Sequence, residues 1–269
     1  MEHENKEKIA SAINILGEFC GPRDIEALTT EALQAKYHIP QVDVAVLFGG
    51  SILAGGDVFA EIMQNRLAKT YIIVGGAGHT TETLRQNMLS SLQADFPPQA
   101  TEAELFDQYL REKYGLKADY LECESTNCGN NITLLLALLK REGIPYKSLL
   151  LTQDASMQRR MDASWRRYVG EEQTLVNYAA YRVKVIVTNG ELCFEEVPTG
   201  MWTMERYIEL LMGDAARLQD NADGYGPKGK NFIAHVDMPS EAQEAFSYLK
   251  QYFAVRKANP AYGKPAVVE

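Results

Sequence analysis

The chain has 269 residues, which is enough for one large α/β domain or for such a domain with a smaller one beside it. Its composition, 46% hydrophobic and 23% charged, is that of a soluble globular protein, and a net charge of −9 without a long basic cluster argues against nucleic acid as a partner. The N-terminus lacks a signal-peptide core, and the longest apolar run, residues 132–139, is far shorter than the ~20 residues that span a bilayer. We therefore expect a cytoplasmic protein that does not enter a membrane.

Apolar segments and helical periods alternate along the middle of the chain. Residues 1–41 have helical periodicity and no strand signal. The strands expected after them are residues 42–50, 70–78, 119–124, 148–154 and 182–189, and the helices expected between these strands are residues 58–68, 102–114, 131–141 and 156–168. Strands that are apolar throughout and separated by helices are typical of a parallel sheet covered on both faces.

This alternation predicts a Rossmann-like α/β fold with three layers, α/β/α, and a mostly parallel sheet of about five strands. A Pro-Pro segment at residues 96–99 marks an insertion before the helix that begins near Thr101. We expect residues 42–199 to form this core. Residues 1–41 and 200–269 form two helical arms, which could pack together as a smaller helical subdomain.

The segment GYGPKGKN, at residues 224–231, has the glycine and lysine spacing of a P-loop, with Asn231 in place of Ser or Thr. A P-loop joins a strand to a helix, so that backbone N–H groups and the helix N-terminus face the phosphate. This segment instead follows a predicted helix and an acidic turn, and Pro227 removes one donor. We interpret it as a glycine- and proline-rich connection.

The connections after the first four strands carry short polar sequences, GGSILAGG, GGAGHTTET, ESTNCGNN and TQDASMQRR. Ligands of an open parallel sheet bind outside the C-terminal ends of its strands. Glycine lets the backbone approach a ligand there, and Ser, Thr or Asn at a helix start leaves N–H groups for an anion. The candidate ligand-binding residues are Gly49, Gly50, Ser51, Gly75, Gly76, Gly78, Ser125, Asn127, Asn131, Gln153 and Arg159.

Three side chains near these connections are candidates for proton transfer in catalysis: Glu124, His79 and Glu102. Glu124 directly follows a strand, and its alternative role is to prepare the turn after it. His79 is either a base or an ordinary polar loop residue. Glu102 opens a helix in a long connection, which makes its reach into a pocket the least direct of the three.

Other polar candidates also have structural alternatives. The glycines would suit tight turns as well as a ligand, and Asn127 or Asn131 could serve to cap the helix that begins near them. Arg159 and Arg160 point about 100° apart on a helix, so we expect one of them to face the strand ends and hold a phosphate or carboxylate. The other would be a solvated surface charge.

The four cysteines fit reduced thiols. Cys123 and Cys128 do not have the spacing of a zinc site, and no second Cys or His pair completes one. We therefore predict no metal.

Several motifs resemble those of a known family: Gly49-Gly50, Gly75-Gly76, Thr101-Glu102-Ala103, Ser125, Asn127, Asn131, Met157 and Arg159. Together they resemble the SanA/ElyC/YdcF-type family of Rossmann-like bacterial domains, whose activity is largely undefined. The segments GMWTMERYIELL and DGYGPKGKNFIAHVD look like the YdcF branch. The chain departs from the family pattern at Ser156, where many members have histidine, at Cys128, which replaces threonine, and at Asn130, which replaces glutamate.

The resemblance implies a nucleoside-type anionic ligand, with S-adenosylmethionine as a possible cofactor. It does not imply methyl transfer, because the glycine-rich loop of ordinary methyltransferases is absent after the first strand. The leading hypothesis is a cytoplasmic enzyme acting on such a small molecule. The alternatives are a metabolite-binding sensor without catalysis and a cell-envelope enzyme that acts on a lipid-linked sugar or on peptidoglycan.

Overall fold

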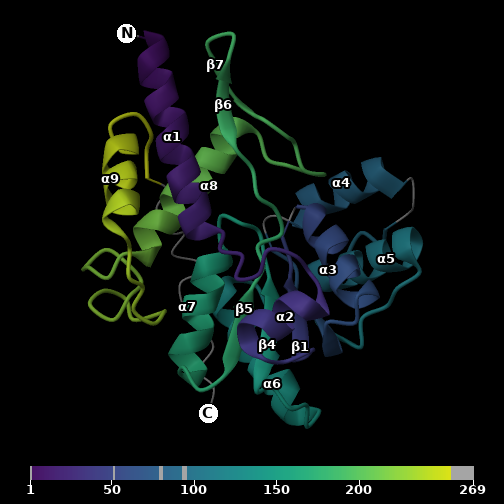
Figure 1. The fold of residues 1–269 in the computed structure, drawn as a ribbon. Helices are drawn as coiled ribbons and strands as arrows, with labels where there is room; N and C mark the ends of the chain where they lie inside the picture. Colours follow the sequence, from purple (N-terminus) through teal and green to yellow (C-terminus); the bar gives the residue numbers. More distant parts are fainter. Residues whose placement is uncertain (1, 51, 79–80, 93–95, 256–269) are drawn as a thin grey trace.

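Five parallel strands form the central sheet of the protein, seen in a computed structural model that describes residues 2–50, 52–78, 81–92 and 96–255 (Figure 1). They are β1 (Val42–Phe48), β2 (Ala68–Val74), β3 (Tyr120–Glu122), β4 (Ser148–Thr152) and β5 (Thr174–Asn177), in the order β3-β2-β1-β4-β5. The strand order reverses between β1 and β4, where doubly wound folds bind their ligands. The prediction of a Rossmann-like α/β fold is confirmed.

The two faces of β1 pack against different helices. Ala45 and Leu47 belong to an apolar cluster with residues of α3 (Ala54–Gln64) and α5 (Glu102–Tyr114). Val44 and Val46 belong to another, with residues of α6 (Cys128–Arg141) and α7 (Gln158–Val169). Because successive side chains of a strand point to opposite faces, one continuous apolar segment fills both layers.

The fifth strand is not the one that we expected. β5 pairs with β4 in parallel, with Leu175 beside Leu149. The expected strand at residues 182–189 instead contributes β6 (Val185–Thr188), which forms an antiparallel hairpin with β7 (Glu191–Phe194). Asn189 and Gly190 turn the hairpin with positive φ angles of 54° and 79°, as the Asn-Gly dipeptide favours. The prediction was wrong here because it did not use this turn signal.

The long connection between β2 and β3 holds two helices where only the second was expected. The first is α4 (Thr81–Leu92), and α5 follows it. A capping box fixes the start of α5: Glu104 N–H donates to Thr101 Oγ1 (3.3 Å), and Thr101 N–H donates to Glu104 Oε2 (2.8 Å). This box places Glu102 in the first turn of α5, close to the sheet.

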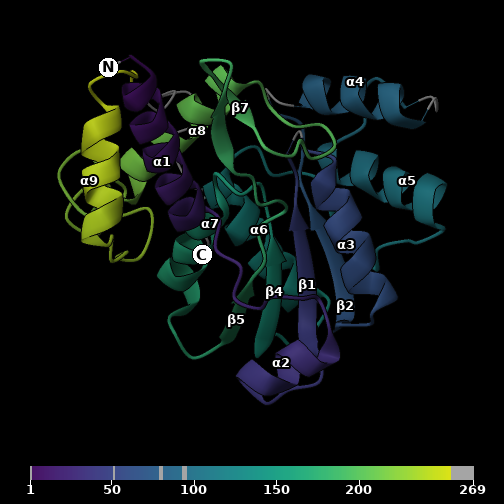
Figure 2. The ribbon, with the colours of Figure 1, turned by 45° about the horizontal axis from the view of Figure 1, so that its top comes forward.

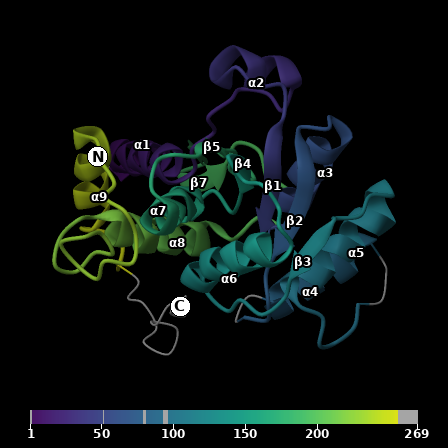
Figure 3. The ribbon, with the colours of Figure 1, turned by 90° about the horizontal axis from the view of Figure 1, so that it is seen from below.

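Helices from both ends of the chain pack beside the sheet domain. Figures 2 and 3 show α1 (Glu2–Cys20) next to α9 (Ser240–Leu249), with α8 (Met204–Leu218) close to both. Their apolar residues share one buried cluster with residues of the β6–β7 hairpin. Asn14 binds this hairpin to α1, because its side chain donates to Val185 O (2.8 Å) and accepts from Val185 N (2.7 Å).

The remaining helix near the N-terminus belongs to the sheet domain. α2 (Thr30–Tyr37) packs through Leu33 into the same cluster as α3 and α5. The expected segments therefore divide differently in space: α1 joins the C-terminal helices, α2 joins the core, and the hairpin inside residues 42–199 lies against α1. Within the described residues, no helix combines the length and apolar character needed to cross a bilayer.

The P-loop-like segment, residues 224–231, lies in the connection from α8 to α9. It follows a helix rather than a strand, and no helix begins directly after it. Asp220 shapes this connection by accepting hydrogen bonds from Lys228 N (2.7 Å) and from His235 Nδ1 (2.7 Å). The segment therefore lacks the strand and helix between which a P-loop holds phosphate.

Candidate functional site

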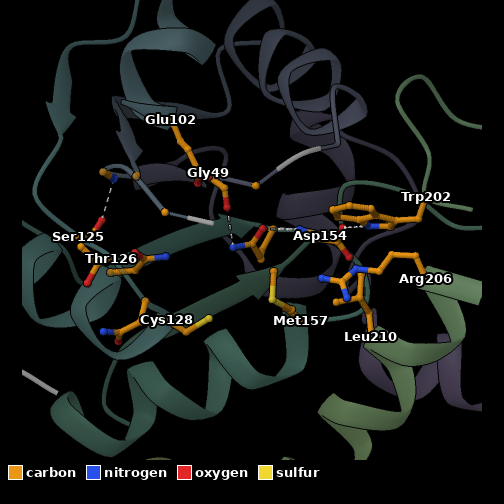
Figure 4. A pocket seen from close by; sticks show the side chains of 17 residues that line it. Gly49, Glu102, Ser125, Thr126, Cys128, Asp154, Met157, Trp202, Arg206 and Leu210 are labelled. Atoms are coloured by element: carbon orange, nitrogen blue, oxygen red, sulfur yellow. Dashed lines mark hydrogen bonds between the residues drawn. The ribbon is translucent and has the colours of Figure 1, made fainter. Parts of the chain in front are cut away.

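A cavity of about 130 Å³ lies at the C-terminal edge of the sheet, next to the point where the strand order reverses (Figure 4). Its walls come from the connections after β1, β2, β3 and β4, together with α8 and the segment before it. The lining residues are Gly49, Gly50, Gly75, Gly76, Gly78, Glu102, Ser125, Thr126, Asn127, Cys128, Asn131, Gln153, Asp154, Met157, Trp202, Arg206 and Leu210. Segments far apart in the sequence thus meet at one site.

Most of the candidate residues gather at this cavity: Gly49, Gly50, Gly75, Gly76, Gly78, Glu102, Ser125, Asn127, Asn131 and Gln153. Glu124 is not among its lining residues, and its side chain is exposed to solvent. Ser51 and His79 lie outside the described residues. Of the three candidates for proton transfer, the structure therefore places Glu102 at the cavity and Glu124 away from it.

The two adjacent arginines do not line the cavity either. The Arg159 guanidinium lies 4.6 Å from the centre of the Phe19 ring and donates to the Phe19 carbonyl, so it joins α7 to the end of α1. Arg160 forms an ion pair with Asp214 of α8. Although burial alone would lower the pKa of Arg160, the Asp214 carboxylate keeps that pKa above its usual value. Both side chains therefore hold elements together, which differs from the anion-binding role expected for one of them.

The glycines line the cavity, but the backbone N–H groups of four of them are occupied. Two of these groups extend the hydrogen bonding of the sheet, one joins the connections after β2 and β3, and one closes the turn before α4. They donate, in chain order, from Gly49 to Val74 O (2.7 Å), from Gly75 to Glu122 O (2.9 Å), from Gly76 to Ser125 O (3.0 Å) and from Gly78 to Thr81 Oγ1 (2.7 Å). The N–H groups of these four glycines are therefore not free to bind a ligand.

Two of these glycines make room for Glu102. A Cβ atom at Gly49 would lie 2.5 Å from Glu102 Oε2, and one at Gly75 would lie 3.0 Å from Glu102 Cβ. Both distances are too short for a side chain without a shift of the carboxylate or its helix. The glycine pairs after β1 and β2 thus allow a carboxylate to lie directly over the ends of the two strands.

Glu102 itself is a buried acid in the cavity wall, with 8% of its surface exposed. Its backbone N–H donates to Gly76 O (3.1 Å), and Thr81 Oγ1 donates to its Oε1 (3.0 Å). The backbone contact and the hydroxyl contact hold the carboxyl group in place. A carboxyl group fixed in this way can exchange a proton with a ligand that reaches it.

The two asparagines of the third connection have different roles. Asn127 caps α6, because its Oδ1 accepts from Asn130 N (3.0 Å) and its amide nitrogen pairs with the Asn130 side chain. Asn131 lies one turn further and is only 9% exposed, and its side chain has no hydrogen-bond partner in the part of the chain that the structure describes. Its amide is not among the unpartnered polar atoms that are closed off from solvent, so it opens onto the cavity. Asn131 is therefore the amide best placed to bind a ligand.

Replacing Asn131 with leucine is expected to keep or raise the free energy of unfolding, because the change removes an unpaired polar group without a large change in volume. The matched control is Asn177→Leu, since Asn177 is also buried but bonds to Asp24 (3.1 Å) and Gln158 (3.0 Å). We expect the control to lose about 1–3 kcal/mol. Urea denaturation of both variants measures the difference, and equal losses would show that the Asn131 amide is satisfied in the free protein.

Asp154 is a buried carboxylate that joins the sheet to the helical part of the molecule. Its Oδ2 accepts from Trp202 Nε1 (2.8 Å), and its Oδ1 accepts from Tyr181 OH (2.8 Å) and from Ser156 Oγ (2.7 Å). Burial and the neighbouring charge of Asp154 raise the pKa of Tyr181. Because Trp202 lies next to Thr203, the N-cap of α8, these hydrogen bonds of Asp154 fix the position of α8 above the strand ends.

The wall opposite the sheet comes from Trp202, which precedes α8, and from Arg206 and Leu210 of α8, and these residues were not predicted. Figure 4 shows the Arg206 side chain extending past Trp202 toward Met157. Arg206 donates to Glu209 Oε2 (2.5 Å), and its guanidinium lies 5.7 Å from the centre of the Trp202 ring. Arg206 and Leu210 are four positions apart on α8, so they share one helix face, and this spacing was the signal available in the sequence. Arg206 supplies the guanidinium that was expected from Arg159.

The cavity thus combines two buried carboxylates on the sheet side with a guanidinium on the helix side. Among the described residues, no group of three or more His, Cys, Asp and Glu side chains is arranged to hold a metal ion. No model of a known protein family matches the chain.

Proposed function

We propose that the cavity at the carboxyl ends of the strands binds a small nucleoside-type ligand that carries an anionic group, with S-adenosylmethionine as the candidate. We further propose that the protein is a cytoplasmic enzyme of the SanA/ElyC/YdcF type that acts on this ligand. The observation that carries the proposal is the meeting of Glu102, Asn131 and Arg206 at one cavity beside the reversal of strand order. This position is the usual ligand site of open α/β sheets.

The distribution of charge favours a ligand that carries both signs. An anionic group would lie near Arg206, which is paired with Glu209 at the edge of the cavity. A positive or hydrogen-donating group would lie near Glu102, whose carboxylate is buried between β1 and β2. S-adenosylmethionine has a carboxylate together with an ammonium and a sulfonium centre, and it therefore matches both ends of the cavity.

The size of the cavity limits how such a ligand would bind. A volume of about 130 Å³ corresponds to roughly four water molecules at ~30 Å³ each, whereas whole ligands occupy pockets of about 300–1,000 Å³. One end of the ligand would therefore enter between Glu102 and Asn131. The rest would lie at the open side, where the Trp202 ring offers a face for stacking.

Calorimetric titration with S-adenosylmethionine tests this assignment. Arg206→Gln is expected to weaken binding about 10- to 100-fold, because it removes a charged donor to the anionic group. The matched control is Arg141→Gln, an exposed arginine of α6 that pairs with Glu142. Absence of measurable binding by the wild-type protein, or equal affinity of the Arg206 variant, would contradict the proposed ligand and its orientation.

A further inference from the structure

A second and larger cavity, of about 580 Å³, lies between the end of α1 and the base of the β6–β7 hairpin. It is lined by Gly17, Glu18, Gly21, Pro22, Arg23, Ala155, Tyr181, Arg182, Val183, Lys184, Glu195, Glu196 and Tyr207. Its volume falls within the range of about 300–1,000 Å³ that is usual for small-molecule sites. None of the candidate residues from the sequence belongs to it.

The floor of this cavity contains a buried hydroxyl group without a partner. Tyr207 is 2% exposed, and in the described part of the chain its hydroxyl makes no hydrogen bond. The hydroxyl reaches the cavity beside Gly17, where a Cβ atom would lie only 2.7 Å from it. The hydroxyl is not among the polar atoms that are closed off from solvent, so it opens onto the cavity and is free to bond to a ligand there.

Charged groups of both signs surround this floor, and some of them lack an opposite partner. Lys184 pairs with Glu195 (3.1 Å), and Arg182 lies 3.6 Å from Glu26 outside the cavity. Arg23 instead binds Ala179 O (2.9 Å) and stacks on Tyr178.

Among the described residues, neither Arg23 nor Glu18 forms an ion pair. Glu18 is in the last turn of α1, where the helix dipole also favours a cation. Glu196 likewise forms no ion pair within the described residues, so one cation without a counterion and two such carboxylates line the same space, together with the apolar side chains of Ala155 and Val183.

We propose that this second cavity is a binding site for an amino-acid-type zwitterion with an apolar side chain. Arg23 binds the ligand carboxylate, Glu18 binds the ammonium group, and the Tyr207 hydroxyl completes the polar contacts. The apolar side chain lies against Ala155 and Val183. This site is separate from the first cavity and does not depend on the function proposed for it.

The two cavities share structural elements. Consecutive residues of α8 line different cavities, Arg206 the first and Tyr207 the second. Tyr181 lines the second cavity and donates to Asp154, a residue of the first. A ligand in the second cavity would therefore contact Tyr181, which bonds to the same Asp154 carboxylate that positions Trp202.

Calorimetry with L-phenylalanine tests the proposal, with 3-phenylpropionate and phenethylamine as analogues that each lack one charge. We expect phenylalanine to bind saturably and at least about tenfold more tightly than either analogue, since each lost charge removes a charge-assisted hydrogen bond. Tyr207→Phe should weaken phenylalanine binding about three- to tenfold. Glu18→Gln should weaken it about tenfold and should remove its advantage over 3-phenylpropionate.

Glu18 is exposed, so its replacement leaves the fold intact and keeps the test decisive. The matched control is Glu171→Gln, an exposed carboxylate in the turn after α7. The proposal would be overturned by no saturable phenylalanine binding at millimolar concentration. Equal binding of phenylalanine and 3-phenylpropionate to the wild-type protein, or an unchanged affinity of the Glu18 variant, would also overturn it.

Discussion

Replacing Glu102 with glutamine is expected to lower turnover of the bound ligand by about 10²- to 10⁴-fold, the usual contribution of a general acid or base. Glutamine has the same shape, so it fits the space that Gly49 and Gly75 leave open, and Thr81 can still donate to its oxygen. Affinity should therefore change much less than turnover. Mass spectrometry of S-adenosylmethionine and its products over time measures the effect.

Glu124→Gln is the matched control, because Glu124 is an exposed carboxylate outside the cavity and the chemical change is the same. We expect this variant to turn over the ligand at the wild-type rate. If the Glu102 variant turned over the ligand at the wild-type rate, Glu102 would have no part in the mechanism. Saturable binding without product in the wild-type protein would favour a metabolite sensor over an enzyme.

Asp214→Ala is expected to lower the free energy of unfolding by about 3–5 kcal/mol. The carboxylate of Asp214 is 2% exposed and pairs with Arg160, whose side chain is 11% exposed. Without Asp214, the Arg160 guanidinium remains charged and buried with no counterion. Because the pair joins α7 to α8, the same change would also loosen the helix that carries Arg206.

Urea denaturation measures this loss, with Asp223→Ala as the control at an exposed position. A double variant, Arg160→Met with Asp214→Leu, should recover much of the stability, since it removes both charges of the pair and leaves only Arg217, which lies 3.6 Å from Asp214, without this partner. A loss below about 1 kcal/mol for Asp214→Ala, the size expected of a surface ion pair, would show that water reaches this pair.

Four strands of the sheet, β1 to β4, were predictable because they are locally distinctive. The segment around Val44 and Leu47 is apolar on both faces, and such a segment fits only a strand covered by helices on both sides. The glycine and Asn clusters follow the strands directly. Because parallel strands end at the same edge of a sheet, these clusters indicated that edge as the ligand site. Local patterns of this kind require no knowledge of distant contacts.

The helical wall of the cavity could not be predicted in the same way. Arg159 lies near a strand end in the sequence, yet α1 returns to that place and Phe19 binds it. Arg206 lies 53 positions after Gln153 in the numbering (206 − 153 = 53), and the contact of Asp154 with Trp202 brings its helix back to the strand ends. Tertiary contacts between such distant segments decide which guanidinium faces the cavity.

Protection of Cys128 from alkylation tests most directly whether the cavity binds the proposed ligand. Cys128 lines the cavity and is partly exposed, while Cys193 on the hairpin is also partly exposed and serves as an internal control. We predict that S-adenosylmethionine slows iodoacetamide labelling of Cys128 in a saturable manner, as peptide mass spectrometry would show, and leaves Cys193 unchanged. An unchanged labelling rate of Cys128 at saturating ligand would contradict binding at this site.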